Sequence, residues 1–122
     1  MVKTKINIDI YSTSLLFIVT DDIYESALTY VKHIKEKEDW SREYAASLQG
    51  VSIYGSNPDY SVLIKYSSLT YNTIVHELFH IARTLTSRIG VEDDEATAWL
   101  LGYLAEKVFK FLEDKKIKIE HG

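Results

Sequence analysis

The residues with the clearest chemical potential lie in one short segment, His76-Glu77-Leu78-Phe79-His80, which has the form H-E-x-x-H. The surrounding pattern predicts a helix, in which four residues span about 400° of turn and about 6 Å of rise. The two imidazoles then project from nearly the same face, as two ligands of one zinc ion must. Glu77 is placed beside the metal, where it can accept a proton from a zinc-bound water. The segment predicts a catalytic zinc site with His76 and His80 as ligands and Glu77 as the catalytic residue.

The alternative is that these histidines are polar surface groups on an ordinary helix. The chain has only four histidines, and two of them stand at this spacing around a glutamate. The same helix also carries an apolar stripe, distinct from the face of the histidines, which would bury it against a core. This stripe consists of Ile74, Leu78, Ile81 and Leu85. The pattern favours metal binding over a solvated surface.

A catalytic zinc commonly has three protein ligands and an open fourth position. No histidine lies between His80 and His121, which excludes an H-E-x-x-H-x-x-G-x-x-H pattern. The candidates for the third ligand are the acids Glu92, Asp93, Asp94 and Glu95. The chain is expected to turn near Gly90, so that each later residue returns toward the metal. Glu95 is farthest along this return and has the longer side chain, so geometry favours it, followed by Asp94. The remaining acids are interpreted as favourable charge at a helix N-terminus.

The elements that would position these residues follow from periodicity and turn signals. Alternating or β-branched apolar runs predict four strands, and apolar residues at helical spacing predict three helices. The strands are expected over 5–11, 15–20, 47–54 and 60–66, with a hairpin turn at 55–59. The run at 15–20 is either a second strand or the continuation of the first. The helices are expected from 21 or 22 to about 37, from Ser68 or Thr70 to a stop near Gly90, and over 93–113. This order predicts one α+β domain that spans residues 1–122.

The motif and its surroundings resemble a minimal gluzincin-type zincin, a class of zinc peptidase with His, His and Glu ligands. The stretch Asp94-Glu95-Ala96-Thr97-Ala98 is similar to the Glu-x-x-Ala sequence around the third ligand in small intracellular zincins, including those of phages and mobile elements. The resemblance covers roughly residues 60–105. It implies that His76, His80 and Glu95 bind zinc and that Glu77 is the base. It also implies a small mixed or antiparallel sheet packed on the active-site helix, followed by a C-terminal helix, with an edge strand that holds extended substrate.

The edge strand has a local candidate, because the strand expected at 60–66 directly precedes the active-site helix. An exposed edge there would pair with a peptide by β-augmentation, whereas the alternative is an ordinary core strand. Three further residues are candidates for the surroundings of the metal. Tyr103 is a candidate for stabilising the oxyanion, and Trp99 for walling the pocket. Arg83 would bind a carboxylate or orient Glu95. The alternative for Tyr103 is core packing, and the alternative for Arg83 is a surface ion pair.

Composition narrows the class of partner. The net charge of −4 argues against nucleic acid, since phosphate binding needs a clustered positive face. The longest apolar run, at 15–19, is far too short to cross a bilayer, and the N-terminal segment lacks the apolar core of a signal peptide. The chain has no cysteine. We therefore expect a cytoplasmic protein that acts on a peptide or protein and contacts neither nucleic acid nor membrane.

Three functions fit a zinc site of this kind. The first is a metallopeptidase that cleaves an intracellular protein. The second is a zincin-fold binding module that regulates a partner with weak or no proteolysis, and the third is a structural zinc site. Glu77 favours the first function, because neither binding nor structural zinc requires a base beside the metal. Structural zinc usually has four ligands, often cysteines, and this chain has none.

Overall fold

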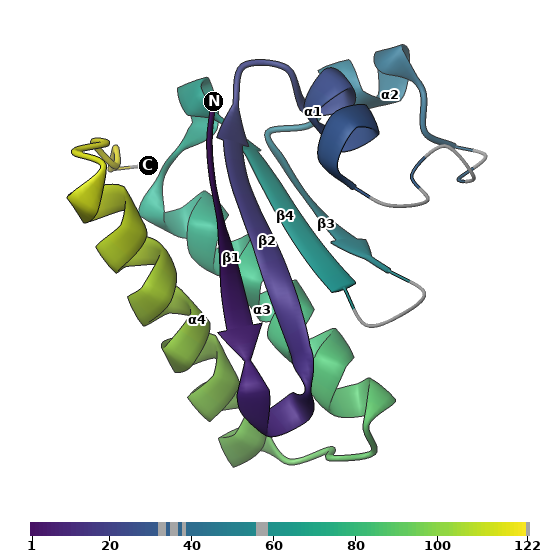
Figure 1. The fold of residues 1–122 in the computed structure, drawn as a ribbon, viewed down its shortest axis with the longest axis vertical. Coiled ribbons are helices and arrows are strands. Elements are labelled where there is room, and N and C mark those ends of the chain that lie inside the picture. The colour runs from purple at the N-terminus through teal and green to yellow at the C-terminus, as the bar shows by residue number, and fades with distance from the viewer. Residues whose placement is uncertain (32–33, 35–36, 38, 56–58, 122) are drawn as a thin grey trace. The chain divides into compact units, whose positions relative to one another are not determined.

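The computed structural model describes residues 1–31, 34, 37, 39–55 and 59–121. The chain divides into two compact units, Met1–Leu69 and Thr70–Gly122. The first unit contains every strand of the described residues, and the second consists of two long helices and a short tail (Figure 1). These elements form an α+β protein with a mixed four-stranded sheet, as the sequence predicts for the fold class. The single-domain assignment stays a prediction, and each unit is described separately.

The sheet of the first unit has the strand order β1-β2-β4-β3. Its strands are β1 (Val2–Ile8), β2 (Thr13–Thr20), β3 (Gly50–Tyr54) and β4 (Asp59–Lys65). The β2–β4 pair is parallel, whereas β1–β2 and β3–β4 are antiparallel. The central strands carry nearly continuous buried apolar runs, which is typical of strands covered on both faces. These residues are Leu15, Phe17, Ile18 and Val19 in β2, and Val62, Leu63 and Ile64 in β4.

Two strand predictions need correction at their ends. The strand expected at 5–11 is β1 and ends at Ile8, because Ile8 pairs with Thr13 and the chain must reverse between them. Asp9–Tyr11 forms one turn of 3-10 helix, and Ser12 closes the reversal in a left-handed conformation. The strand expected at 47–54 begins only at Gly50. A short helix, α2 (Arg42–Ala46), precedes it; Ser41 caps this helix, Ser47 is its C-cap, and residues 48–49 connect it to the strand.

The helix expected from 21 or 22 to about 37 is also too long. It is α1 (Ile23–Tyr30), and Asp22 caps it by accepting a hydrogen bond from the backbone N–H of Glu25 at 3.1 Å. Val31 is extended and ends the helix, so the apolar spacing beyond it reflects burial rather than continued helix. Ile34 still joins the core between the sheet and the two short helices, with Ile18, Ile23, Ala27, Ala45, Ile53 and Leu63. The rest of the predicted extension, at 32–33 and 35–36, lies outside the described residues.

The interpretation of 60–66 as a substrate-binding edge is wrong. This segment is β4, which pairs with β2 on one side and with β3 on the other, so its backbone hydrogen bonds are used within the sheet. The edges of the described sheet are β1 and β3. The antiparallel β3–β4 pairing confirms the predicted hairpin, although residues 56–58 of its turn are outside the described part of the chain.

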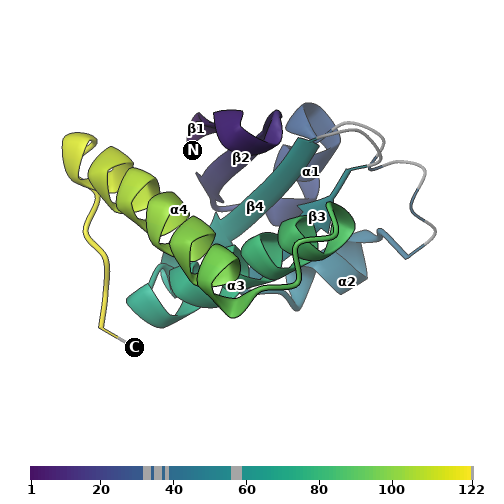
Figure 2. The same ribbon diagram turned by 90° about the horizontal axis from the view of Figure 1, so that it is seen from below.

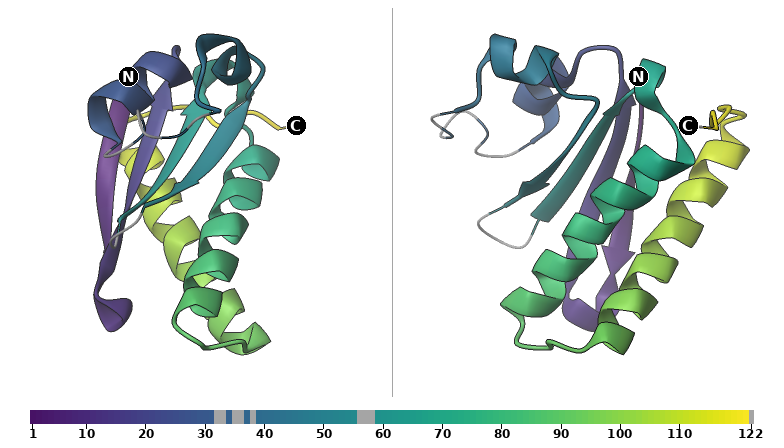
Figure 3. Two further views of the ribbon diagram at one scale, coloured as in Figure 1. Left: turned by 90° about the vertical axis from the view of Figure 1, so that its right-hand side faces the viewer. Right: turned by 180° about the vertical axis from the view of Figure 1, so that it is seen from behind.

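The second unit consists of α3 (Tyr71–Arg88) and α4 (Asp94–Asp114), which lie side by side (Figures 2 and 3). Thr70 caps α3 by accepting from the backbone N–H of Thr73, as the sequence predicts for one of its two candidate starts. After α3, Gly90 adopts a positive φ of 79°, which glycine tolerates without strain. Asp93 caps α4, within one residue of the predicted start. Among the residues that the structure describes, no helix combines the length and apolarity needed to cross a membrane.

Candidate metal centre

The two predicted histidine ligands meet on one exposed face of α3. The Nε2 atoms of His76 and His80 are 3.2 Å apart, and their ring centroids are 4.7 Å apart with the planes nearly perpendicular. Two nitrogens bound to one tetrahedral zinc at about 2.05 Å would lie about 3.3 Å apart. The pair therefore already has the nitrogen spacing of a shared zinc ligand set. The same spacing also suits a hydrogen bond between one protonated and one unprotonated ring nitrogen.

Glu77 lies on a different side of the helix from the histidines. It is 8% exposed, whereas both histidines are exposed, and it follows His76 by about 100° of helix rotation. Its neighbours on this side include the buried stripe that the sequence predicts, Ile74, Leu78, Ile81 and Leu85. Glu77 also takes part in an interaction, so it is not isolated. Burial restricts the orientation of its side chain, and a general base must be held in a defined orientation.

Two contacts fix the register of the helix pair. The hydroxyls of Thr86 in α3 and Thr97 in α4 are 3.0 Å apart, and the rings of Tyr71 and Phe109 meet edge to face at a centroid distance of 5.6 Å. The contacts join the end of α3 to the start of α4 and the start of α3 to the later part of α4. The two helices are therefore antiparallel, and every residue of α4 has a defined level along α3.

This register places the predicted third ligand away from the histidine pair. Glu95 is exposed in the first turn of α4, level with the last turn of α3 and about 10 Å along the helix axis from His80. Asp94 is exposed in the same turn, Glu92 precedes the helix, and Asp93 is its cap. Within the described ranges, no group of three or more His, Cys, Asp or Glu side chains could hold a metal ion. The structure brings His76 and His80 together and does not bring Glu95 to them.

The other predicted residues divide between the two helices. Trp99 is 52% exposed and stacks on the half-buried ring of Tyr103, with centroids 5.6 Å apart and planes 12° apart. The register sets Tyr103 level with the α3 segment that carries the motif. Arg83 is exposed, one turn after His80. Tyr103 lies about 120° around α4 from both Thr97 and Phe109, whose side chains contact α3, so its ring is not on the contact face, and its role beside the centre stays a prediction.

The buried threonine pair is a structural feature that the sequence analysis missed, because two threonines in separate helices give no periodic signal. The Thr86 hydroxyl donates to the carbonyls of Ala82 and Arg83, at 3.0 and 3.2 Å, so the Thr97 hydroxyl must donate to Thr86. Thr86→Val removes the acceptor of a buried hydroxyl and should destabilise the protein by about 1–3 kcal/mol. Thr97→Val should cost less, because Thr86 keeps its carbonyl partners.

The double variant Thr86→Val/Thr97→Val supplies the control for this prediction. Replacing both hydrogen-bonding partners by apolar groups of similar shape can be nearly neutral. Urea unfolding should therefore show the double variant to be more stable than Thr86→Val alone. A double variant that is less stable than either single variant would show that the hydroxyl pair does not act as proposed.

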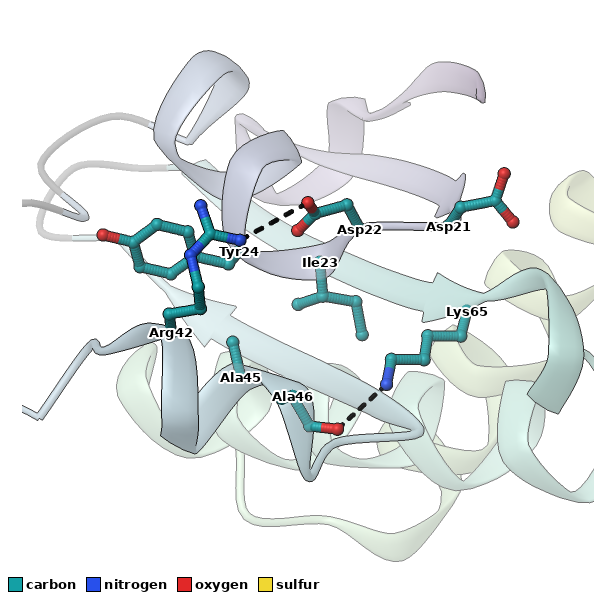
Figure 4. A pocket seen from close by; sticks show the side chains of 8 residues that line it. All are labelled: Asp21, Asp22, Ile23, Tyr24, Arg42, Ala45, Ala46 and Lys65. Atoms are coloured by element: carbon teal, nitrogen blue, oxygen red, sulfur yellow. Dashed lines mark hydrogen bonds and ion pairs between the residues drawn. The ribbon is translucent and has the colours of Figure 1, made fainter.

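The first unit contains a separate pocket of about 310 Å³, near the start of α1 (Figure 4). Its charged groups are largely engaged with one another or with the backbone. Arg42 pairs with Glu25 at 2.6 Å and with Asp22 at 3.7 Å and lies over the Tyr24 ring, while Lys65 donates to the Ala46 carbonyl at 3.0 Å. These contacts tie α1, α2 and β4 together. No histidine is among the described residues that line the pocket, and we interpret it as a structural brace rather than the reactive site.

Comparisons of the chain with protein-family models, with curated proteins and with solved structures gave no match.

Proposed function

We propose that this chain is a zincin-type, zinc-dependent metallopeptidase, in which His76 and His80 bind the metal and Glu77 is the general base. The observation that carries the proposal is the 3.2 Å separation of the two Nε2 atoms on one exposed helix face, next to a buried glutamate. The substrate would be a peptide or protein in the cytoplasm, with no role for nucleic acid or membrane. The net charge of −4 supports this substrate class over nucleic acid.

The residues of α3 would divide the chemistry between them. His76 and His80 would hold the metal on the exposed face of α3. The metal would supply a Lewis acid that polarises the scissile carbonyl and makes water nucleophilic near neutral pH. Glu77 accepts a proton from the attacking water and returns it to the leaving amine nitrogen, which completes cleavage of the C–N bond. For both steps the Glu77 side chain would have to reach from its buried side of α3 to the face of the two histidines, one residue away from His76.

The third ligand is proposed to be Glu95, on the basis of the Glu-x-x-Ala resemblance. Because Glu95 lies about 10 Å along the helix axis from His80, zinc binding by variants of the four acids tests this ligand directly. Glu95→Ala should weaken zinc binding by more than the ~10–100-fold typical of residues that only support a ligand. Glu92→Ala should change it little. Asp93 is better replaced by Asn, which preserves the cap of α4, and this variant should also retain zinc.

Zinc titrations of the four single variants, with Asp94→Ala as the fourth, distinguish the possible ligand sets. Loss of zinc in Asp94→Ala with retention in Glu95→Ala would move the ligand by one residue and leave the metallopeptidase proposal intact. Unchanged affinity in all four variants would contradict the gluzincin ligand set.

Removal and return of the metal tests the proposed function itself. Wild-type protein treated with a chelator should lose hydrolysis of an unfolded protein substrate, and about one equivalent of zinc should restore it. Mg²⁺ should not restore it, because Mg²⁺ prefers oxygen ligands in octahedral geometry. Binding of zinc without any zinc-dependent cleavage would instead favour the regulatory binding module.

A further inference from the structure

We propose that His76 and His80 also bind one zinc ion jointly with the same two histidines of a second copy of the chain, in a dimer that does not hydrolyse peptides. This inference rests on the proposed function, because it uses the same zinc ligands. It adds regulation of that site, since the ratio of zinc to protein would decide whether the histidine pair serves catalysis or assembly.

The histidine pair supplies half of a tetrahedral ligand set. Its two Nε2 atoms are 3.2 Å apart, close to the spacing of two nitrogens bound to one zinc ion. The acid favoured as third ligand, Glu95, lies about 10 Å along the helix axis from His80. The pair in this arrangement leaves two positions on the ion. A second pair with the same spacing would fill both, and every copy of the chain carries such a pair.

The face of α3 around the pair is open to a second copy. The exposed side chains on this arc of the helix are Asn72, Val75, His76, Phe79, His80, Arg83 and Ser87. None of them is acidic, although the chain carries a net charge of −4. Two such faces therefore meet without opposing carboxylates on the arc itself.

Apolar side chains beside the pair favour a protein surface as its occupant. Val75 is 37% exposed and Phe79 is 42% exposed, so contact with a second copy would remove apolar area from water. The rings of Phe79 and His80 have centroids 6.3 Å apart, which places this apolar surface close to the ligand nitrogens. Metal coordination and apolar burial would thus act on the same small area of α3.

An assembly of this kind is limited to two chains and is inactive. Both copies use the same patch, so the contact is two-fold symmetric and leaves no further patch free for a third copy. Four histidine nitrogens complete the tetrahedral set of the ion. No position then remains for the attacking water or the scissile carbonyl, which metal-assisted hydrolysis requires.

Mass action makes the dimer depend on the amount of zinc. With about half an equivalent of zinc per chain, two chains share each ion and the dimer forms. With zinc in excess, each chain holds an ion of its own, so the dimer dissociates into chains that retain about one zinc each. The expected dependence on zinc therefore rises and then falls, unlike that of a metal that only stabilises the fold.

Sedimentation equilibrium of the wild-type protein, freed of metal and then titrated with zinc, tests the proposal. The mass should be that of one chain without zinc, twice that at about half an equivalent, and that of one chain again with zinc in excess. X-ray absorption at the zinc edge should show four nitrogen ligands at about 2.0–2.1 Å in the dimer. Hydrolysis of an unfolded protein substrate, measured in the same samples, should be lost in the dimer and recovered with excess zinc.

Two variants identify the residues that join the copies. His80→Ala leaves one motif histidine per chain and should keep the mass of one chain at every zinc level, with unchanged circular dichroism because His80 is exposed. His121→Ala is the matched control, since its ring packs near Tyr71 outside the motif, and it should dimerise as the wild-type protein does.

The outcomes separate this inference from the proposed function. Zinc binding with the mass of one chain throughout, or a dimer that persists in His80→Ala, would overturn the shared site and leave the metallopeptidase proposal standing. A histidine-dependent dimer with full turnover per zinc would overturn its inactivity. The expected dimer without hydrolysis at any zinc level would support the shared site and contradict the proposed function, whereas a wild-type protein that binds no zinc would contradict both.

Discussion

Replacement of His76 and His80 together by alanine is expected to abolish zinc binding and leave the protein folded. Wild-type protein should contain about one zinc per chain, because the two Nε2 atoms already have the spacing that a tetrahedral ion requires. Both side chains are exposed, and alanine is the strongest helix former, so the substitutions should not destabilise α3. Elemental analysis of purified protein, with circular dichroism to verify the fold, measures both effects.

His121→Ala is the matched control for the double variant. His121 lies outside the motif, and its ring packs near Tyr71 with a centroid distance of 5.6 Å. This variant should retain a full equivalent of zinc. Full zinc in the His76→Ala/His80→Ala protein would show that the metal binds elsewhere, and the assigned ligands would be wrong.

Glu77→Gln is expected to retain zinc and the fold but to lose hydrolysis. Glutamine is nearly isosteric with glutamate and can occupy the same buried position, but its amide cannot act as a general base. Turnover should fall by about 10²–10⁴-fold, the usual contribution of a positioned general base. The rate constant kcat should carry most of the loss, since proton transfer occurs in the transition state. Steady-state kinetics on a peptide cleaved by the wild-type protein provide the measurement.

Glu106→Gln provides the same chemical change at an exposed position of α4 and should leave kcat unchanged. Wild-type turnover in Glu77→Gln would rule out Glu77 as the base. A parallel loss of zinc and fold in this variant would assign Glu77 a structural role instead, since the residue is buried in α3.

The parts of the structure that the sequence predicted are those set by local interactions. Thr70 and Asp93 define the helix starts, because a threonine or aspartate side chain satisfies free backbone N–H groups within three residues. Gly90 marks the connection because its positive φ is a local requirement. The placement of His76 and His80 on one face depends only on helix periodicity. The spacing of the histidine pair was therefore predictable from five consecutive residues.

The features that depend on distant parts of the chain were less predictable. The position of β4 inside the sheet follows from its pairing with β2, more than 40 residues earlier by the register of Phe17 with Val62. The nearly continuous apolar run of β4 indicates a central strand rather than an edge strand. The level of Glu95 depends on how α3 and α4 align, and the Thr86–Thr97 contact that sets this alignment has no sequence signature. The turn of the chain near Gly90 was therefore not sufficient to place the Glu95 carboxylate near the histidine pair.

Hydrolysis in H₂¹⁸O tests the central claim, zinc-dependent cleavage of peptide bonds by Glu77, most directly. Wild-type and Glu77→Gln proteins, both loaded with zinc, would be incubated with lysate proteins, and new peptide ends would be identified by mass spectrometry. The account predicts new C-terminal carboxylates that carry ¹⁸O in the wild-type sample, and their near absence with Glu77→Gln. Equal sets of labelled ends in the two samples, or none above background with the zinc-loaded wild-type protein, would contradict it.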